Sequence, residues 1–140
     1  GWIQAALDTN TGLKRVYLAG PPCMEAEADG NRVVGINEEE LKVPGCISRY
    51  MEDSGLPLYI SLDKDILNRS CAVTNWDQGE TQLEDVLACI KEAASCRGII
   101  GVDVCGEDPE QEGIRASQIN QNTNREIICK LMEVCGILCP

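Results

Sequence analysis

The stretch Leu58-Tyr59-Ile60-Ser61-Leu62-Asp63-Lys64-Asp65 decides the fold, because an apolar segment runs directly into two carboxylates. Gly55-Leu56-Pro57 precedes it, and an apolar run bounded by such a turn signal is typical of a short buried strand. Side chains alternate along an extended chain, so we expect Asp63 and Asp65 on one side and Lys64 on the other. Two carboxylates this close repel each other unless a cation lies between them. At the carboxyl end of a strand in an α/β sheet, the pattern indicates a metal ion.

A simpler interpretation stays open for the same residues. A polar turn is also an ordinary way to end a buried strand. In that case Asp63 and Asp65 cap the strand and bind nothing. A single Asp-x-Asp pattern does not separate the two interpretations, so the rest of the chain has to.

The composition bounds the class of protein. Residues 1–140 are enough for one domain with a sizeable core, and we expect a single domain. The net charge of -11 argues against nucleic acid or an anionic membrane as a partner, since either would require a basic face. No apolar run approaches the roughly 20 residues of a membrane-spanning helix.

The chain has nine cysteines and no histidine. The cysteine spacing contains no C-x-x-C pair, so we expect no structural zinc site. Cys89, Cys105 and Cys129 fall in apolar segments, where free cysteine acts as a small hydrophobic side chain, and we expect a protein of the reducing cytoplasm. Histidine is the usual metal ligand and general base near neutral pH, so chemistry in this chain must rely on carboxylates, lysine, cysteine or the backbone.

Apolar runs and helical periodicity alternate along the chain. We expect strands at residues 15–20, 33–36, 58–62 and 99–104. We expect helices at residues 2–7, after Asn37, at 47–51, from the Thr81/Glu84 capping box to Gly98, and from a start between Asn120 and Asn124, where asparagines suit turns and caps. This alternation predicts an α/β fold with a mainly parallel sheet. The carboxyl ends of its strands would share one edge and bring together Gly20-Pro21, residues 63–65 and residues 103–108.

Three segments, taken in order, resemble the C-terminal half of the arginase/deacetylase (ureohydrolase) superfamily, in particular an uncharacterised arginase-like group. They are Ser61-Leu62-Asp63-Lys64-Asp65, then Thr74-Asn75-Trp76-Asp77-Gln78-Gly79 with its capped helix, then Gly101-Val102-Asp103-Val104-Cys105-Gly106-Glu107. The Asp-x-Asp element and the loop after it are the more specific part. The resemblance covers most of the chain and implies a three-layer α/β/α domain, of which these residues are the C-terminal part.

The resemblance also implies a metal centre. Proteins of the superfamily bind two manganese ions, and by matching position Asp63 would bridge both ions while Asp65 would bind one of them. The remaining ligands of the family come from an earlier Asp-x-His-x-Asp-type motif and an earlier histidine, and neither occurs in this chain. We therefore expect an incomplete manganese site.

Two positions depart from the arginase pattern. Arginases place a substrate-binding Glu after the later strand, and the ungapped position here is Gly106, with Glu107 one residue on. The Asp-Pro that follows the Asp-x-Asp in arginases is replaced by Ile66-Leu67-Asn68-Arg69. What the resemblance still implies is hydrolysis of a C–N bond, of guanidino or amide type, in a small-molecule substrate.

Further residues at the same sheet edge are candidates for the substrate pocket. Asp77 either shapes the pocket or is a turn acid that precedes a helix. Asp103 and Glu107 either line the pocket or cap the end of their strand. We expect Lys64 to be solvated or paired, and Trp76 to be a hydrophobic plug.

The expected function is therefore an arginase-like, manganese-dependent hydrolase, with this chain inactive by itself and its catalytic residues unknown. The alternative is a non-catalytic α/β binding or scaffold domain, which the absence of histidine favours. The strand at residues 15–20 or at 58–62 would lack a neighbour in such a partial domain. We therefore expect the chain to self-associate as a homo-oligomer through an open strand edge or an exposed apolar face.

Overall fold

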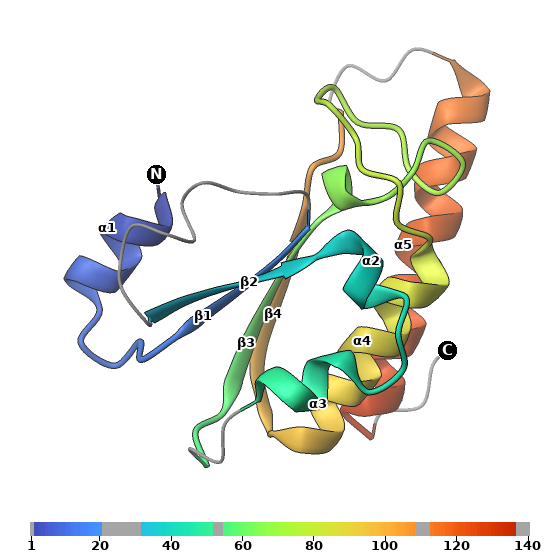
Figure 1. Cartoon of the computed structure of the whole chain (residues 1–140). Helices are drawn as coiled ribbons and strands as arrows, with labels where there is room; N and C mark the ends of the chain where they lie inside the picture. The colour runs from blue at the N-terminus through green and yellow to red at the C-terminus, as the bar shows by residue number, and fades with distance from the viewer. Residues whose placement is uncertain (1, 21–31, 52–54, 109–112, 137–140) are drawn as a thin grey trace.

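The computed structural model describes residues 2–20, 32–51, 55–108 and 113–136, and it has the predicted α/β fold (Figure 1). The strands are β1 (Val16–Gly20), β2 (Val33–Asn37), β3 (Leu58–Asp63) and β4 (Ile99–Cys105). The helices are α1 (Trp2–Thr9), α2 (Glu38–Leu41), α3 (Cys46–Tyr50), α4 (Leu83–Cys96) and α5 (Ile114–Val134), and a short 3-10 helix, η3 (Lys64–Ile66), follows β3.

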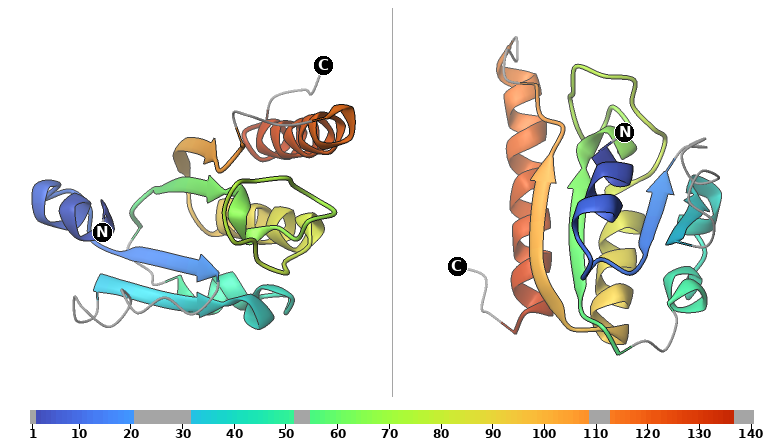
Figure 2. Two further views of the ribbon diagram at one scale, coloured as in Figure 1. Left: turned by 90° about the horizontal axis from the view of Figure 1, so that it is seen from above. Right: turned by 90° about the vertical axis from the view of Figure 1, so that its left-hand side faces the viewer.

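The four strands form two parallel pairs, β1 with β2 and β3 with β4. The register of the second pair shifts between Leu58 and Tyr59, and then runs on to place Asp63 opposite Cys105. Figure 2 shows the strands following one another in the order β2, β1, β3, β4, so the parallel arrangement predicted from the sequence is confirmed. In the described residues no hydrogen-bonded ladder joins β1 to β3, and the sheet is therefore divided in the middle.

Helices cover both faces of the β1–β2 pair because apolar side chains alternate along β1. Val16 and Leu18 pack on one side against the buried residues Ile3 and Leu7 of α1. Tyr17 points to the other side and packs against the buried residues of α2 and α3. This arrangement gives the layers of helix, sheet and helix.

The β3–β4 pair has its helices on one face. Ile60 and Leu62 of β3 pack into the largest core cluster, which α4 and α5 complete with Leu83, Val86, Leu87, Ile90 and Ile127. On the opposite face Tyr59 is 61% exposed and Ser61 is also exposed. The second face of β3 is therefore open to solvent along the line that leads to Asp63.

Two predicted helix starts are wrong. α4 begins after Gln82, and the hydroxyl of Thr81 binds Glu38 instead of capping the helix. α5 begins at Ile114, before the predicted start between Asn120 and Asn124, because its first turns are polar on most sides and show little apolar periodicity. The helix expected after Asn37 is present as α2, and Asn37 and Glu40 form a capping box at its start, with reciprocal hydrogen bonds. Among the helices described, none combines the length and the apolarity needed to cross a membrane.

The cysteines differ from expectation. Cys129 is in a disulfide rather than free. Of the cysteines that are free, Cys46 is buried, Cys89 is partly buried, and Cys105 is exposed at the end of β4. An apolar sequence context therefore did not place Cys105 in the core, because it lies on the uncovered face of the β3–β4 pair.

Candidate metal site at the end of β3

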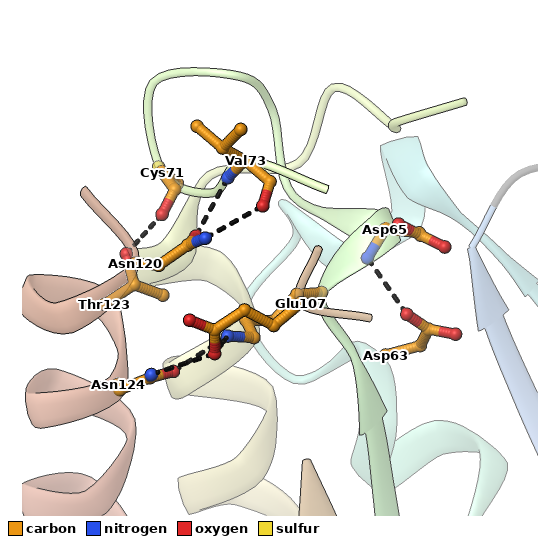
Figure 3. A network of polar contacts seen from close by, with 9 residues as sticks. Asp63, Asp65, Cys71, Val73, Glu107, Asn120, Thr123 and Asn124 are labelled. Atoms are coloured by element: carbon orange, nitrogen blue, oxygen red, sulfur yellow. Dashed lines mark hydrogen bonds and ion pairs between the residues drawn. The ribbon is translucent and has the colours of Figure 1, made fainter. Parts of the chain in front are cut away.

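The candidate site begins where β3 ends. Strand alternation stops at Asp63, since Lys64 to Ile66 form a 3-10 helix. Asp63 caps this helix, and its Oδ1 accepts a hydrogen bond of 3.1 Å from the backbone N–H of Asp65. Figure 3 shows both carboxylates on one side of the strand end, with Glu107 and Asn124 on the other. The capping interaction expected of a simple turn is therefore present, and it also fixes the two carboxylates relative to each other.

Oδ1 of Asp65 is the atom of this site that is best suited to bind a cation. Its Oδ1 is buried and has no hydrogen-bond partner in the described structure. A buried carboxylate oxygen without a partner costs free energy, which a bound cation would offset. The backbone of the residue is held in place, because its carbonyl oxygen accepts a hydrogen bond of 2.6 Å from the N–H of Gly79.

The carboxylates of the two aspartates are suitable ligands for a manganese ion, but two residues are too few to complete its coordination. Carboxylate oxygens suit hard or borderline divalent ions such as Mn²⁺. Within the described ranges, however, no group of three or more histidine, cysteine, aspartate or glutamate residues is placed so that it could hold a metal ion. Asp63 and Asp65 can therefore supply part of a metal centre, and further ligands would have to come from elsewhere.

Gly106 packs directly against the carboxylate of Asp63. A Cβ atom at this position would lie 2.2 Å from Asp63 Oδ1 and 2.9 Å from the backbone nitrogen of Lys64. The backbone φ of +88° is also one that glycine adopts without strain. The place where arginases carry a substrate-binding Glu therefore has no room for any side chain in this protein.

Lys64 points away from the carboxylate pair and is 2% exposed. Its Nζ donates to Oε2 of Glu107 at 2.8 Å and to Oδ1 of Asn124 at 2.9 Å. Asn124 also donates to the same Glu107 oxygen at 3.2 Å. Lys64 is thus paired, as one of the two expectations had it, and Glu107 faces α5 rather than the pair of aspartates (Figure 3).

Asp103 lies on the open face of the β3–β4 pair and is the hydrogen-bond acceptor for two hydroxyl groups of β3. Ser61 Oγ donates to Asp103 Oδ1 at 2.9 Å. The Tyr59 hydroxyl also binds Asp103, and this hydrogen bond, with partial burial, raises the pKa of the tyrosine. Gly101 makes the arrangement possible, because a Cβ there would lie 2.6 Å from the Tyr59 ring. Asp103 is placed on the same face as Asp63, and the register puts Ser61 opposite it.

Cys105 stands opposite Asp63 in the ladder. Partial burial raises the pKa of its thiol, and the charges of Asp63 and Asp103 raise it further. The thiol is therefore held in its neutral form beside the carboxylates. A thiolate ligand for a metal is correspondingly disfavoured at this position.

The loop between η3 and α4 is fixed by side chains of α5. Asn120 is fully buried, and it accepts from the N–H of Val73 at 2.9 Å and donates to its carbonyl oxygen at 2.8 Å. Thr123 is buried next to it and donates to the carbonyl oxygen of Cys71 (Figure 3). Asn120 and Asn124 therefore lie inside a helix as tertiary contacts, and the expectation that they are turn and cap residues is wrong. The sequence does contain a sign of these contacts. Asn120, Thr123 and Asn124 are spaced three or four residues apart, on the same side of the helix as the buried Ile127.

The tip of this loop faces solvent. Trp76 is 72% exposed, so the prediction of a hydrophobic plug is wrong. Asp77 is exposed beside it, and its carboxylate takes no part in the contacts that hold Asp63, Asp65, Asp103 and Glu107. The structure does not bring Asp77 together with the other candidates.

Glu38, the first residue after β2, reaches the same region and was not singled out from the sequence. Its Oε1 accepts from the backbone N–H of Glu80 and from the hydroxyl of Thr81, both at 3.3 Å. Gly79 leaves the space for it, since a Cβ at that residue would lie 2.1 Å from Glu38 Oε1. Glu38 thus connects the end of β2 to the loop that follows β3. This contact was not predicted because Glu38 is one of three consecutive glutamates, which the sequence analysis assigned to the first turn of a helix.

Comparison with known proteins gives one relative of interest. The chain is 35% identical over 130 residues to an uncharacterised protein of Thermotoga maritima. The match covers 93% of this chain and 48% of the relative, so the chain spans about half the length of the protein that it matches. No family model and no solved structure matches the chain. The resemblance to arginase-like proteins therefore stays a prediction.

Proposed function

We propose that this chain is part of an arginase-like, manganese-dependent hydrolase of C–N bonds, with Asp63 and Asp65 among the metal ligands. The observation that carries the proposal is the buried Oδ1 of Asp65, which has no partner among the described residues and lies next to a second carboxylate at the carboxyl end of a parallel strand. The order of the three sequence segments supports the same assignment. A small-molecule substrate, rather than nucleic acid or membrane, suits the net charge of -11.

This chain would contribute two negatively charged carboxylates, held in fixed positions where they can bind metal. A pair of divalent ions in such a centre supplies a water molecule that is nucleophilic at neutral pH. Asp63 is fixed by the N–H of Asp65 and by Gly106, and Asp65 by Gly79, so both carboxylates are preorganised to hold metal. Neither would act as the base. Asp103 lies on the same strand face, and it would border the substrate.

The substrate class is narrowed by Glu107. Because its carboxylate is paired with the buried ammonium of Lys64, it is not available to bind a guanidinium group in the way that the Glu of arginases would. An amide or another neutral C–N substrate therefore fits this site better than a free guanidinium. The proposal keeps hydrolysis of a C–N bond and drops arginine-like recognition through this residue.

Titration with Mn²⁺ tests the metal assignment. With two carboxylates supplied, we expect the chain alone to bind Mn²⁺ weakly and to hydrolyse no substrate, and a longer protein that contains it to bind tightly. Calorimetry of the Asp63→Ala and Asp65→Ala variants should show loss of binding, whereas Asp77→Ala, an exposed aspartate of the nearby loop, should bind like the parent. Unchanged binding in Asp63→Ala would contradict the proposal, and so would tight binding of two ions by the chain alone.

A non-catalytic α/β binding or scaffold domain is the second candidate. Two observations favour it, the absence of histidine and the engagement of Glu107 in an internal ion pair. The sequence of the complete gene separates the two candidates. An Asp-x-His-x-Asp-type motif upstream of Trp2 supports the enzyme, and a start of translation near Gly1 supports the scaffold.

A further inference from the structure

Lys64 lies between the two aspartates of the candidate site, and its charge is buried. Among the described residues it is the one charged side chain in the core, at 2% exposure. Burying an ammonium group is costly unless the charge is paired and its N–H groups are bonded. Even then, a buried ion pair is often no better for stability than an apolar pair of similar volume. The burial of Lys64 therefore indicates a role other than stability.

Two elements distant in the sequence hold the Lys64 ammonium group. Nζ donates to Oε2 of Glu107, just after β4, at 2.8 Å and to Oδ1 of Asn124 in α5 at 2.9 Å. Asn124 also donates to Oε2 of Glu107 at 3.2 Å, so the three side chains form a closed set of hydrogen bonds (Figure 3). Nζ cannot move away without losing bonds to both partners.

The backbone of Lys64 carries this anchor to the carboxylates. Its carbonyl oxygen accepts the N–H of Leu67 at 3.0 Å. The N–H on the other side of the same peptide group belongs to Asp65, and it donates to Asp63 Oδ1 at 3.1 Å. A peptide group is planar, so fixing Lys64 also fixes the direction in which this N–H points. The position of the Asp63 carboxylate therefore depends on where the Lys64 side chain is held.

We propose that Lys64 is a positioning residue for the metal site. The bonds to Glu107 and Asn124 hold Lys64 in place. Lys64 in turn fixes the peptide group that keeps the carboxylates of Asp63 and Asp65 in the arrangement that a divalent cation needs. The inference rests on the proposed function, because it takes the two carboxylates to be ligands of Mn²⁺. Lys64 itself contacts neither metal nor substrate and acts through the backbone.

The effect of position can be separated from the effect of charge. An ammonium group close to a cation site repels the cation, and Glu107 neutralises that charge. The double variant Lys64→Met/Glu107→Gln removes one positive and one negative charge together. The net charge beside the aspartates is then the same as in the parent, while the ion pair that anchors Lys64 is gone. A change in Mn²⁺ affinity in this variant therefore reports the loss of position.

Two measurements on the complete 140-residue chain test the proposal. Electron paramagnetic resonance of free Mn²⁺ gives the Kd, and amide exchange followed by NMR without metal gives the protection of the Asp65 N–H. In the double variant we expect the Kd to rise about tenfold, as is typical when a residue that supports metal ligands is lost. We also expect faster exchange at Asp65, while the amides of β1 keep their rates.

A milder variant and a matched control accompany the double variant. Asn124→Ala removes one of the two partners of Lys64 without changing any charge, and it should raise the Kd by about threefold. It also keeps the test available if the double variant does not fold. Lys91→Met/Glu133→Gln makes the same two substitutions in an exposed ion pair of 3.5 Å between α4 and α5, and it should leave the Kd within about twofold.

The possible results separate this inference from the proposed function. If Asp63→Ala raises the Kd but the Lys64→Met/Glu107→Gln and Asn124→Ala variants do not, Lys64 is not a positioning residue, and the proposed function stands. If Asp63→Ala leaves the Kd unchanged, the proposed function fails and the inference fails with it. A weaker Kd without faster exchange at Asp65, or an equal loss in the control pair, would also overturn the role of Lys64.

Discussion

Asp63 and Gly106 are in direct contact across the end of the β3–β4 ladder, and a Cβ at Gly106 would lie 2.2 Å from Asp63 Oδ1. That oxygen also accepts the N–H of Asp65, so the carboxylate has little freedom to move aside. Gly106 stands where arginases have a substrate-binding Glu. In this chain a glycine is required there, because the carboxylate of Asp63 occupies the space that a side chain would need.

Gly106→Ala should destabilise the protein by about 3 kcal/mol, because it adds a clash with Asp63 and Lys64 to the cost of a positive φ. Gly45→Ala is the matched control, since Gly45 has a φ of +81° but a Cβ at that residue would meet no atom within 4 Å. It should cost about 1 kcal/mol. Urea unfolding of both variants measures the difference, and equal losses would show that the contact with Asp63 is not tight.

Glu107→Gln should destabilise the protein more than Lys64→Met. The glutamine variant leaves a buried ammonium with neutral partners, at a cost of about 2–3 kcal/mol after allowance for the partial exposure of Glu107. The methionine variant removes the buried charge and keeps similar volume, and it should change the stability by less than about 1 kcal/mol. Urea unfolding ranks the two, and the opposite order would mean that the ion pair itself, rather than the burial of Lys64, dominates.

Cys105 should react slowly with iodoacetamide at pH 8 although it is exposed. Burial and the neighbouring aspartates raise its pKa, so the reactive thiolate is scarcer than in a free thiol, and the rate should keep rising at a pH where a small-molecule thiol has levelled off. Asp63→Asn should increase the rate at pH 8 by about twofold to fivefold, because one of the charges is removed. Mass spectrometry of the Cys105 peptide follows the reaction. A rate equal to that of a small-molecule thiol would show that the carboxylates do not act on it.

Stability should fall as the pH rises above about 9, in part through Cys89. Burial raises the pKa of this thiol from 9.0 to about 12 in the folded state. The unfolded chain therefore releases the proton first, and the stabilisation present below pH 9 is lost as the pH climbs toward 12. The free energy of unfolding, measured in urea from pH 8 to 11, should fall less steeply in Cys89→Ala. Parallel slopes would show that Cys89 is not the group responsible.

Local sequence patterns were sufficient for most of the fold. The apolar runs around Leu18 and Ile60 predicted parallel strands, and Asn37 with Glu40 formed the cap that its side chains suggest. These features depend on nearest neighbours in the chain. The start of α5 was missed for the complementary reason, because its first turns contain few apolar residues to show a period.

The sequence was sufficient to predict the two aspartates of the site, but it was not sufficient to predict the contacts that support them. Asp63 and Asp65 stand out because two acids end an apolar strand. The burial of Lys64 depends on Glu107 and Asn124, which are 43 and 60 residues away in the chain. No local pattern in the sequence reports such a contact, and Trp76 and Thr81 were misjudged for the same reason.

The amide of Asn120 gives the loop above the site an anchor outside its own sequence. By bonding both the N–H and the carbonyl oxygen of Val73, this side chain acts as a substitute peptide group, like one residue of a neighbouring strand. The path of the loop is then set by α5, while Trp76 and Asp77 at its tip contribute little to holding it. Natural or engineered variation can therefore alter the residues at the tip of the loop, while the backbone that carries them keeps its course.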